Sequence, residues 1–112
     1  MRKIFVKFVL TLTAAFAWHF AHATEPDLYL LTISNHKFEP MILEVPAGKK
    51  IKLVVKNLDM TPEEFESYDL NREKVVAGKS EITVNVGPLK PGTYKFFGEF
   101  HKDTAQGQLV AK

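Results

Sequence analysis

The sequence predicts a small all-β domain, and three observations support this prediction. The chain of 112 residues has the size of one small domain. Its apolar residues fall in several short runs, and some of these runs alternate with polar residues as a half-buried strand does. Pro and Gly residues separate the runs at the spacing typical of an antiparallel sandwich or barrel. Nine Phe and only 25% charged residues exclude intrinsic disorder, because burying the apolar side chains offsets the entropy lost on ordering the chain.

Six segments are predicted to be strands. In residues 50–57, Ile51, Leu53 and Val55 share one parity and predict one buried face. Residues 81–86 repeat this alternation, and residues 88–92 predict a turn because Pro presets φ and Gly tolerates positive φ. The predicted strands are residues 29–33, 41–45, 50–57, 81–86, 93–100 and 108–111.

Residues 58–76 have no clean hydrophobic period, so two interpretations are open. A helical turn is possible after Thr61 and Pro62, with Thr61 as the cap and Pro62 in the first helical position. Residues 63–67 are equally compatible with an extended segment, in which Glu64 and Glu66 share a face and Phe65 faces the other way.

Residues 1–23 are predicted to be a signal peptide that is cleaved before Thr24. A basic start is followed by an apolar stretch that is too interrupted for a good membrane span, and residues 21–23 match a small-x-small cleavage pattern. A retained anchor is the alternative. Removing three of the 15 Lys and Arg leaves 12 against 13 Asp and Glu, so residues 24–112 are near neutral and lack the charge typical of nucleic-acid binding.

The chain contains no Cys, which restricts its chemistry to nitrogen, oxygen and thioether ligands. Residues 59–66 and 98–103 concentrate side chains that bind metals. Glu64 and Glu66 from the first segment and His101 from the second would suit iron, zinc or copper(II). The alternative is that these glutamates form only a solvated acidic edge. Nucleophilic and hydrolytic sites have little support, because Ser67 and Ser80 have no evident His and acid partners in the sequence.

The order of the segments resembles the cupredoxin family across nearly the whole of residues 24–112. The resemblance lies in Phe38-Glu39-Pro40, Val45-Pro46-Ala47-Gly48, Asn57-Leu58-Asp59, Pro91-Gly92-Thr93-Tyr94 and Gly107-Gln108-Leu109. It implies a Greek-key β-sandwich whose metal ligands come from the two segments already singled out. The subgroup that it resembles is the EfeO-type cupredoxin domain of bacterial periplasmic iron uptake, including the small partners of Ftr-type ferrous-iron permeases.

The chain departs from the blue-copper members of that family. Gly98 stands where those proteins carry Cys, His101 keeps the position of a later His, and the His of the first loop falls at or near Glu64. Without a thiolate, a blue copper centre cannot form. The resemblance implies a site of Glu64, Glu66 and His101 for a copper or iron ion. Further candidate ligands, close by in sequence, are Met60, Glu99 and Asp103.

Two further residues are assigned structural positions. His36 is expected at the surface, because the family has no ligand at its position. Tyr94 is expected to pack in the core with its hydroxyl bonded to a backbone group.

The resemblance implies a periplasmic protein that assists iron uptake by binding or oxidising ferrous iron, with an iron permease as its partner. Whether it is an enzyme is left open. One alternative is a metal-free interaction module for a permease. Another is copper storage or resistance, in which the Met60 thioether binds copper(I).

Overall fold

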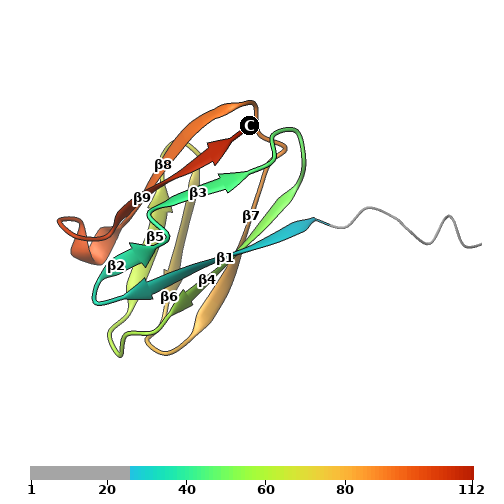
Figure 1. The fold of residues 1–112 in the computed structure, drawn as a ribbon. Helices are drawn as coiled ribbons and strands as arrows, with labels where there is room; N and C mark the ends of the chain where they lie inside the picture. Colours follow the sequence, from blue (N-terminus) through green and yellow to red (C-terminus); the bar gives the residue numbers. More distant parts are fainter. Residues whose placement is uncertain (1–25) are drawn as a thin grey trace, which may run out of the picture.

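The computed structural model describes residues 26–112, so the predicted signal peptide lies outside the described residues. These residues form two packed β-sheets (Figure 1). The strands are β1 (Asp27–Ser34), β2 (Lys37–Glu39), β3 (Ile42–Val45), β4 (Ile51–Asn57), β5 (Glu63–Ser67), β6 (Arg72–Val76), β7 (Glu81–Val86), β8 (Gly92–Gly98) and β9 (Gln106–Ala111), with a short 3-10 helix, η2 (Glu99–His101).

The strand order confirms the predicted all-β sandwich. One sheet has the order β2-β1-β4-β7, and the other has the order β3-β9-β8-β5-β6. β1 pairs with β4, and β3 with β9, in parallel, whereas the remaining pairs are antiparallel. Within residues 26–112 there is no helix long and apolar enough to span a membrane.

The core lies between the sheets and is built from alternate residues of the strands. In β4 the predicted parity is correct, because Ile51, Leu53 and Val55 are each at most 1% exposed. Aromatic rings join the two sheets. Phe38 of β2 packs edge-on to Phe96 of β8, with the ring centroids 4.9 Å apart. Burying such side chains stabilises the fold by roughly 1.5–3 kcal/mol each.

The unassigned segment 58–76 contains two strands, so the interpretation of a helical turn after Thr61 and Pro62 is wrong. β5 pairs with β8 on one side and β6 on the other. Its Phe65 is fully buried, and this burial accounts for an extended conformation that the many charges of the segment obscured. The predicted strand 93–100 also ends earlier, at Gly98, because η2 follows from Glu99.

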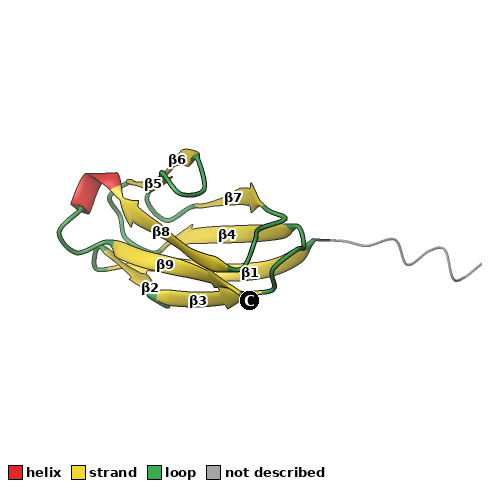
Figure 2. Ribbon diagram, turned by 90° about the horizontal axis from the view of Figure 1, so that it is seen from above, coloured by secondary structure: helices red, strands yellow, loops and turns green. Residues whose placement is uncertain are grey.

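One end of the sandwich gathers the β1–β2 turn, the β4–β5 loop and η2 (Figure 2). The buried Asn57 organises the loop. Its side-chain Nδ2 donates to the carbonyl of Thr61 at 2.8 Å, and its Oδ1 accepts from the N–H of Asp59 at 3.0 Å.

The expected hydrogen bond of Tyr94 to the backbone is confirmed, because its hydroxyl donates to the carbonyl of Lys90 at 2.7 Å. Tyr94 packs against the core while remaining partly exposed.

Candidate metal centre

The candidate site is divided by the alternation of strand β5. Successive residues of a strand face opposite sides of its sheet, so Glu63 faces the interior together with Phe65, while Glu64 and Glu66 face outward. The two predicted segments do meet at this end of the sandwich. The residue that meets His101, however, is Glu63, one position before the predicted Glu64.

Glu63 is a buried carboxylate whose two oxygens both have hydrogen-bond partners. The whole Glu63 residue is only 1% exposed. Its Oε1 accepts the backbone N–H of Glu64 at 2.9 Å and that of Phe100 at 2.8 Å. Its Oε2 lies 2.6 Å from Nδ1 of His101. These contacts fasten η2 to β5 and fix the imidazole of His101, as buried polar groups require partners.

His36 stacks on His101 and is more than the surface residue expected from the sequence. The two imidazole centroids are 3.6 Å apart, and the ring planes differ by 12°. Nε2 of His36 also lies 3.4 Å from Oγ1 of Thr61. His36 reaches this place because it belongs to a tight turn at the same end of the sandwich as η2.

Asp59 holds that turn. Its carboxylate accepts the backbone N–H of Asn35 at 2.8 Å and that of His36 at 2.9 Å. Both residues have positive φ, an uncommon conformation that these bonds help to maintain. Partial burial raises the pKa of Asp59, but the two backbone bonds, followed by the nearby imidazoles of His36 and His101, outweigh it and lower the pKa below 3.8.

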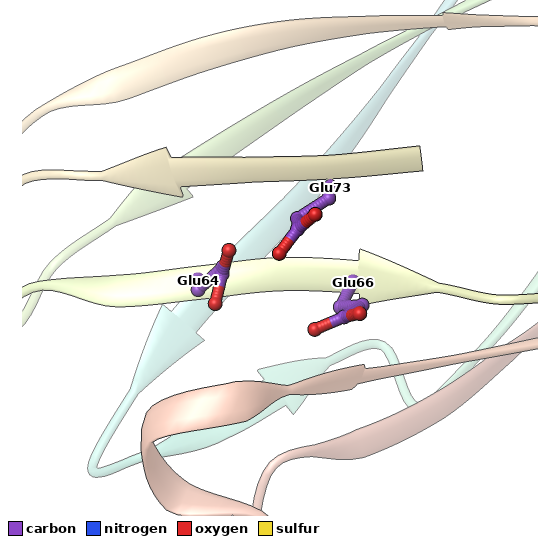
Figure 3. Close-up of side chains that lie close together, drawn as sticks. All are labelled: Glu64, Glu66 and Glu73. Atoms are coloured by element: carbon purple, nitrogen blue, oxygen red, sulfur yellow. The ribbon is translucent and has the colours of Figure 1, made fainter. Parts of the chain in front are cut away.

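The outward glutamates form a second group. Glu64 and Glu66 of β5 approach Glu73 of β6, and one carboxylate oxygen from each lies within 4.8 Å of the other two. Figure 3 shows the three side chains, with Glu73 directed toward Glu64 across the two neighbouring strands. Among the described residues, no other group of acidic or histidine side chains has the spacing of a three-ligand cation site. We call these three residues the carboxylate cluster.

Crowding of like charges shows in the pKa values of the carboxylate cluster. A side-chain hydrogen bond with Glu73, then desolvation and the neighbouring negative charges, raise the pKa of Glu64 to about 6. Desolvation and the charges of Glu73 and Glu99 also raise the pKa of Glu66. A bound cation would relieve this repulsion, because an opposite charge favours the ionised carboxylates.

The other predicted ligands lie around these two groups. Glu99 of η2 borders the carboxylate cluster, and its Oε1 lies 3.5 Å from Nζ of Lys102. Asp103 is exposed and lines an open depression that also contains His101 and His36. Met60 is 82% exposed in the β4–β5 loop. The structure therefore brings Glu64, Glu66 and Glu99 together and pairs His101 with Glu63.

A thiolate-bound copper centre does not fit these residues. The chain has no Cys, and the space beside Gly98 is filled by Glu63 and Ala105. A Cβ at position 98 would lie 2.6 Å from Cδ of Glu63 and 2.7 Å from Cβ of Ala105. The Glu63 carboxyl group thus fills space that a side chain at position 98 would need. An oxygen site does fit, because the carboxylate cluster presents three hard ligands.

The two packed sheets and the carboxylate cluster define a β-sandwich that can bind a metal ion. Comparison with known protein families and solved structures shows which family it belongs to. The chain belongs to the Cupredoxin-like domain family, whose profile matches residues 6–111. It is also 54% identical over 80 residues to an uncharacterized protein, RP394, of Rickettsia prowazekii strain Madrid E. That alignment covers 71% of this chain and 64% of the relative, so the chain spans less than two thirds of its length.

Solved structures show the same fold at low sequence identity. Auracyanin A, a "blue" copper protein from Chloroflexus aurantiacus, has a TM-score of 0.66 and 15% identity, covering 79% of this chain and 100% of its own. A purple cupredoxin from Nitrosopumilus maritimus has a TM-score of 0.60 and 18% identity, covering 75% and 99%. The metal-binding domain of the Streptococcus pneumoniae Cu(I)-exporting ATPase CopA has a TM-score of 0.65 and 11% identity, covering 80% and 91%.

Three residues were absent from the predicted site. Glu63 could have been found from the buried parity that it shares with Phe65, had residues 63–67 been assigned as a strand. Glu73 lies on β6, and its pairing opposite Glu66 depends on a register that no local pattern specifies. His36 lies 65 positions before His101 in the chain, so only the tertiary fold brings the rings together.

Proposed function

We propose that this chain is an exported metal-binding protein that assists iron uptake, with iron held by Glu64, Glu66 and Glu73. The observation that carries this proposal is the approach of three carboxylate oxygens to within 4.8 Å of one another on the outer face of β5 and β6. Glu99 is close enough to raise the pKa of both Glu64 and Glu66, so it is a further candidate ligand.

The chemistry of the carboxylate cluster favours iron. Carboxylate oxygens are hard donors, and they stabilise iron(III) relative to iron(II). The cluster can therefore bind ferrous iron and make its oxidation easier. In an oxidation, each ferrous ion gives up one electron, and dioxygen is the acceptor that we propose. Binding without oxidation is the simpler form of the same proposal.

Copper(II) is the second metal compatible with the cluster, since it also accepts oxygen ligands. The proteins that share this fold include a "blue" copper protein and a domain solved with Cu(I), which supports a role in metal binding. Storage of copper(I) has weaker support, because Met60 is 82% exposed and its thioether is not shielded from water.

The proposal also includes the location and the partner. A signal peptide at residues 1–23 would direct residues 24–112 to the periplasm. There the domain would act as an EfeO-type cupredoxin and deliver iron to a ferrous-iron permease. The carboxylate cluster lies on an outer face, with Glu64 and Glu66 half-buried and Glu73 exposed. This position suits such delivery, since an ion on an outer face exchanges readily with a partner.

Calorimetric titration with ferrous iron under anaerobic conditions tests the proposal. We expect Glu64→Gln and Glu73→Gln each to weaken binding at least about tenfold, because each removes a charged ligand. Glu81→Gln is the matched control, since Glu81 is an exposed glutamate of the other sheet. If the unsubstituted protein and all three variants bound iron with equal affinity, the carboxylate cluster would not be the iron site. Equal rates of iron(III) formation with and without protein in air would leave binding alone.

A metal-free interaction module is the second candidate, and an aromatic pair favours it. Tyr68 is 74% exposed and lies edge-on to Phe97, with centroids 5.4 Å apart. Nζ of Lys102 lies 5.7 Å from the centroid of Phe97 on the same surface. Metal-depleted protein that binds a permease as strongly as metal-loaded protein would favour this role, and Tyr68→Ala would then weaken the complex.

A further inference from the structure

We infer that the first half of β1 pairs with the same segment of a second copy of this chain, so that two copies form a dimer through β1. The inference goes beyond the proposed function, because β1 and the carboxylate cluster belong to different sheets. It starts from the short register of β2, which pairs with β1 only at residues 32–34 (Figure 1). Within residues 26–112, residues 27–31 therefore have no strand on that side, and we call them the free edge of β1.

The backbone groups of Leu28 and Leu30 point out of the sheet at the free edge. The N–H of Asp27 and the carbonyl of Ile33 both form their hydrogen bonds on the side of β4. Because backbone groups alternate in direction along a strand, every second residue from Asp27 faces β4, and Leu28 and Leu30 face the other way. Their N–H and carbonyl groups are therefore available to a further strand.

The side chains at the free edge are apolar and exposed. Leu28 is 65% exposed and Leu30 is 53% exposed, whereas Leu31 and Ile33, which have the opposite parity, are fully buried. Leu30 lies beside Val54 of β4, which extends the apolar strip on the outer face of the sheet. An edge that carries leucines and no charge between them is a template for pairing with another strand.

Two other edges of the sandwich are protected against such pairing. At the edge of β7, Nε of Arg72 donates to the carbonyl of Asn85 at 2.9 Å. Nζ of Lys74 donates to the carbonyl of Thr83 at 3.1 Å on the same edge. The edge strand β3 is flanked by prolines and carries the exposed Glu44. Charges and prolines are the usual protection of a strand edge, and the free edge of β1 has neither at its two leucines.

A second copy of β1 satisfies both the backbone and the side chains of the free edge. In an antiparallel pair centred on Tyr29, Leu28 of one copy lies opposite Leu30 of the other, and the two residues exchange their backbone hydrogen bonds. The same contact occurs twice, because the two copies are related by a two-fold axis. The leucines of the two copies then cover one another on the outer face.

The limits of the free edge match this pairing. A pair centred on Tyr29 places Pro26 of one copy opposite Thr32 of the other. Pro26 has no N–H to donate, and the edge at Thr32 is already occupied by β2. The ladder therefore ends at the same point on both sides and spans residues 27–31. This match in length and limits favours a second copy over a strand of unrelated sequence.

Sedimentation equilibrium over a concentration series from about 1 µM to about 1 mM tests the dimer. We expect a reversible monomer–dimer equilibrium, since a five-residue ladder buries little surface. Leu30→Lys should weaken the dimer at least about tenfold, because it places a charge against an apolar strand. Ile42→Lys is the matched control, since Ile42 is 56% exposed on the edge strand β3, and it should leave the dimer unchanged. All samples are the full chain, so residues 1–25 are the same in each.

A cysteine at the two-fold axis tests the register, since the chain has no Cys of its own. Tyr29 would lie opposite its own copy as a non-hydrogen-bonded pair, with Cα atoms about 4.5 Å apart, and a disulfide spans this distance. With oxidised glutathione as the electron acceptor, Tyr29→Cys should form a linked dimer at least about tenfold faster than Ile42→Cys. Leu28→Cys should also link slowly, because its own copy lies diagonally at roughly 7–8 Å.

Three outcomes would overturn the inference. One is a monomer at every concentration. Another is a dimer that Leu30→Lys leaves intact, which would place the interface elsewhere on the molecule. The third is equal rates of linking in Tyr29→Cys and Ile42→Cys, and these rates decide alone if Leu30→Lys does not fold. A dimer lost in Leu30→Lys together with rapid linking in Tyr29→Cys would support it. Iron binding by the carboxylate cluster is measured separately, so either proposal can fail without the other.

Discussion

The carboxylate of Glu63 lies 2.6 Å from the imidazole of His101, and this contact joins strand β5 to the 3-10 helix that follows β8. The contact occurs beside Gly98, where a side chain would collide with the Glu63 carboxyl group. Glycine at position 98 and glutamate at position 63 are therefore complementary. Glu63 and His101 form a hydrogen-bonded pair beside Gly98 that orients the imidazole.

The first prediction concerns the stability that Glu63 provides. Glu63→Ala leaves Nδ1 of His101 and the N–H groups of Glu64 and Phe100 without their acceptor. We expect the free energy of unfolding to fall by about 3 kcal/mol, since buried polar groups without partners are costly. Urea denaturation measures this change. Glu81→Ala is the exposed control and should change stability by at most about 0.5 kcal/mol. Equal stability of the two variants would contradict the structural role of Glu63.

The second prediction concerns the space beside Gly98. Its φ of −99° is open to any residue, so a substitution there tests packing alone. Gly98→Ala should lower the free energy of unfolding by about 1–3 kcal/mol, because the new Cβ would overlap Glu63 and Ala105. In the Glu63→Ala background the same substitution should cost less, and a double-mutant cycle measures the difference. Purely additive costs would show that Glu63 does not fill this space.

The third prediction is a pH dependence from the carboxylate cluster. The pKa of Glu64 is raised from 4.5 to about 6, so the folded state binds more protons than the unfolded state between these values. The contribution of Glu64 to stability must therefore decrease as pH rises through this window. Thermal unfolding between pH 4.5 and 6.5 should show that Glu64→Gln gains stability relative to the unsubstituted protein as pH rises. A constant difference across the window would contradict the crowding of these carboxylates.

The fourth prediction has the opposite sign and concerns Asp59. Its pKa is lowered below 3.8, so its stabilising effect is present above that pH and is lost as pH falls through the folded-state value. Asp59→Asn should lower Tm by about 5 °C at pH 7, because one charged acceptor of two backbone bonds becomes neutral. The difference should shrink below pH 3.8. A difference that persists unchanged at pH 2.5 would show that the charge of Asp59 is unimportant.

Much of the fold was predictable because its strands carry local signals. The alternation of Ile51, Leu53 and Val55 reports a buried face directly. The break predicted at residues 88–92 marks the connection between β7 and β8, although that connection runs from one sheet to the other and Gly92 already belongs to β8. β5 was ambiguous for a physical reason. Its buried positions hold Glu63, Phe65 and Ser67, so two of three inward residues are polar, and their burial depends on partners elsewhere in the chain.

The candidate site was predictable only in part. Glu64 and Glu66 share a face, as an extended segment requires, and both belong to the carboxylate cluster. The third member of the carboxylate cluster is Glu73, and its place beside Glu64 and Glu66 depends on the register between β5 and β6. The pairing of His101 with Glu63 and the stacking of His36 depend on loops that meet only in the folded sandwich, so no spacing in the sequence encodes them.

The most direct test of the central claim is the position of bound iron. Crystals of the protein loaded with iron would be measured at the iron absorption edge, and an anomalous difference map would be calculated. We predict a peak bounded by the carboxylates of Glu64, Glu66 and Glu73. A map with iron only elsewhere in the molecule, or with no iron at saturating concentration, would contradict the assignment of the carboxylate cluster as the iron site.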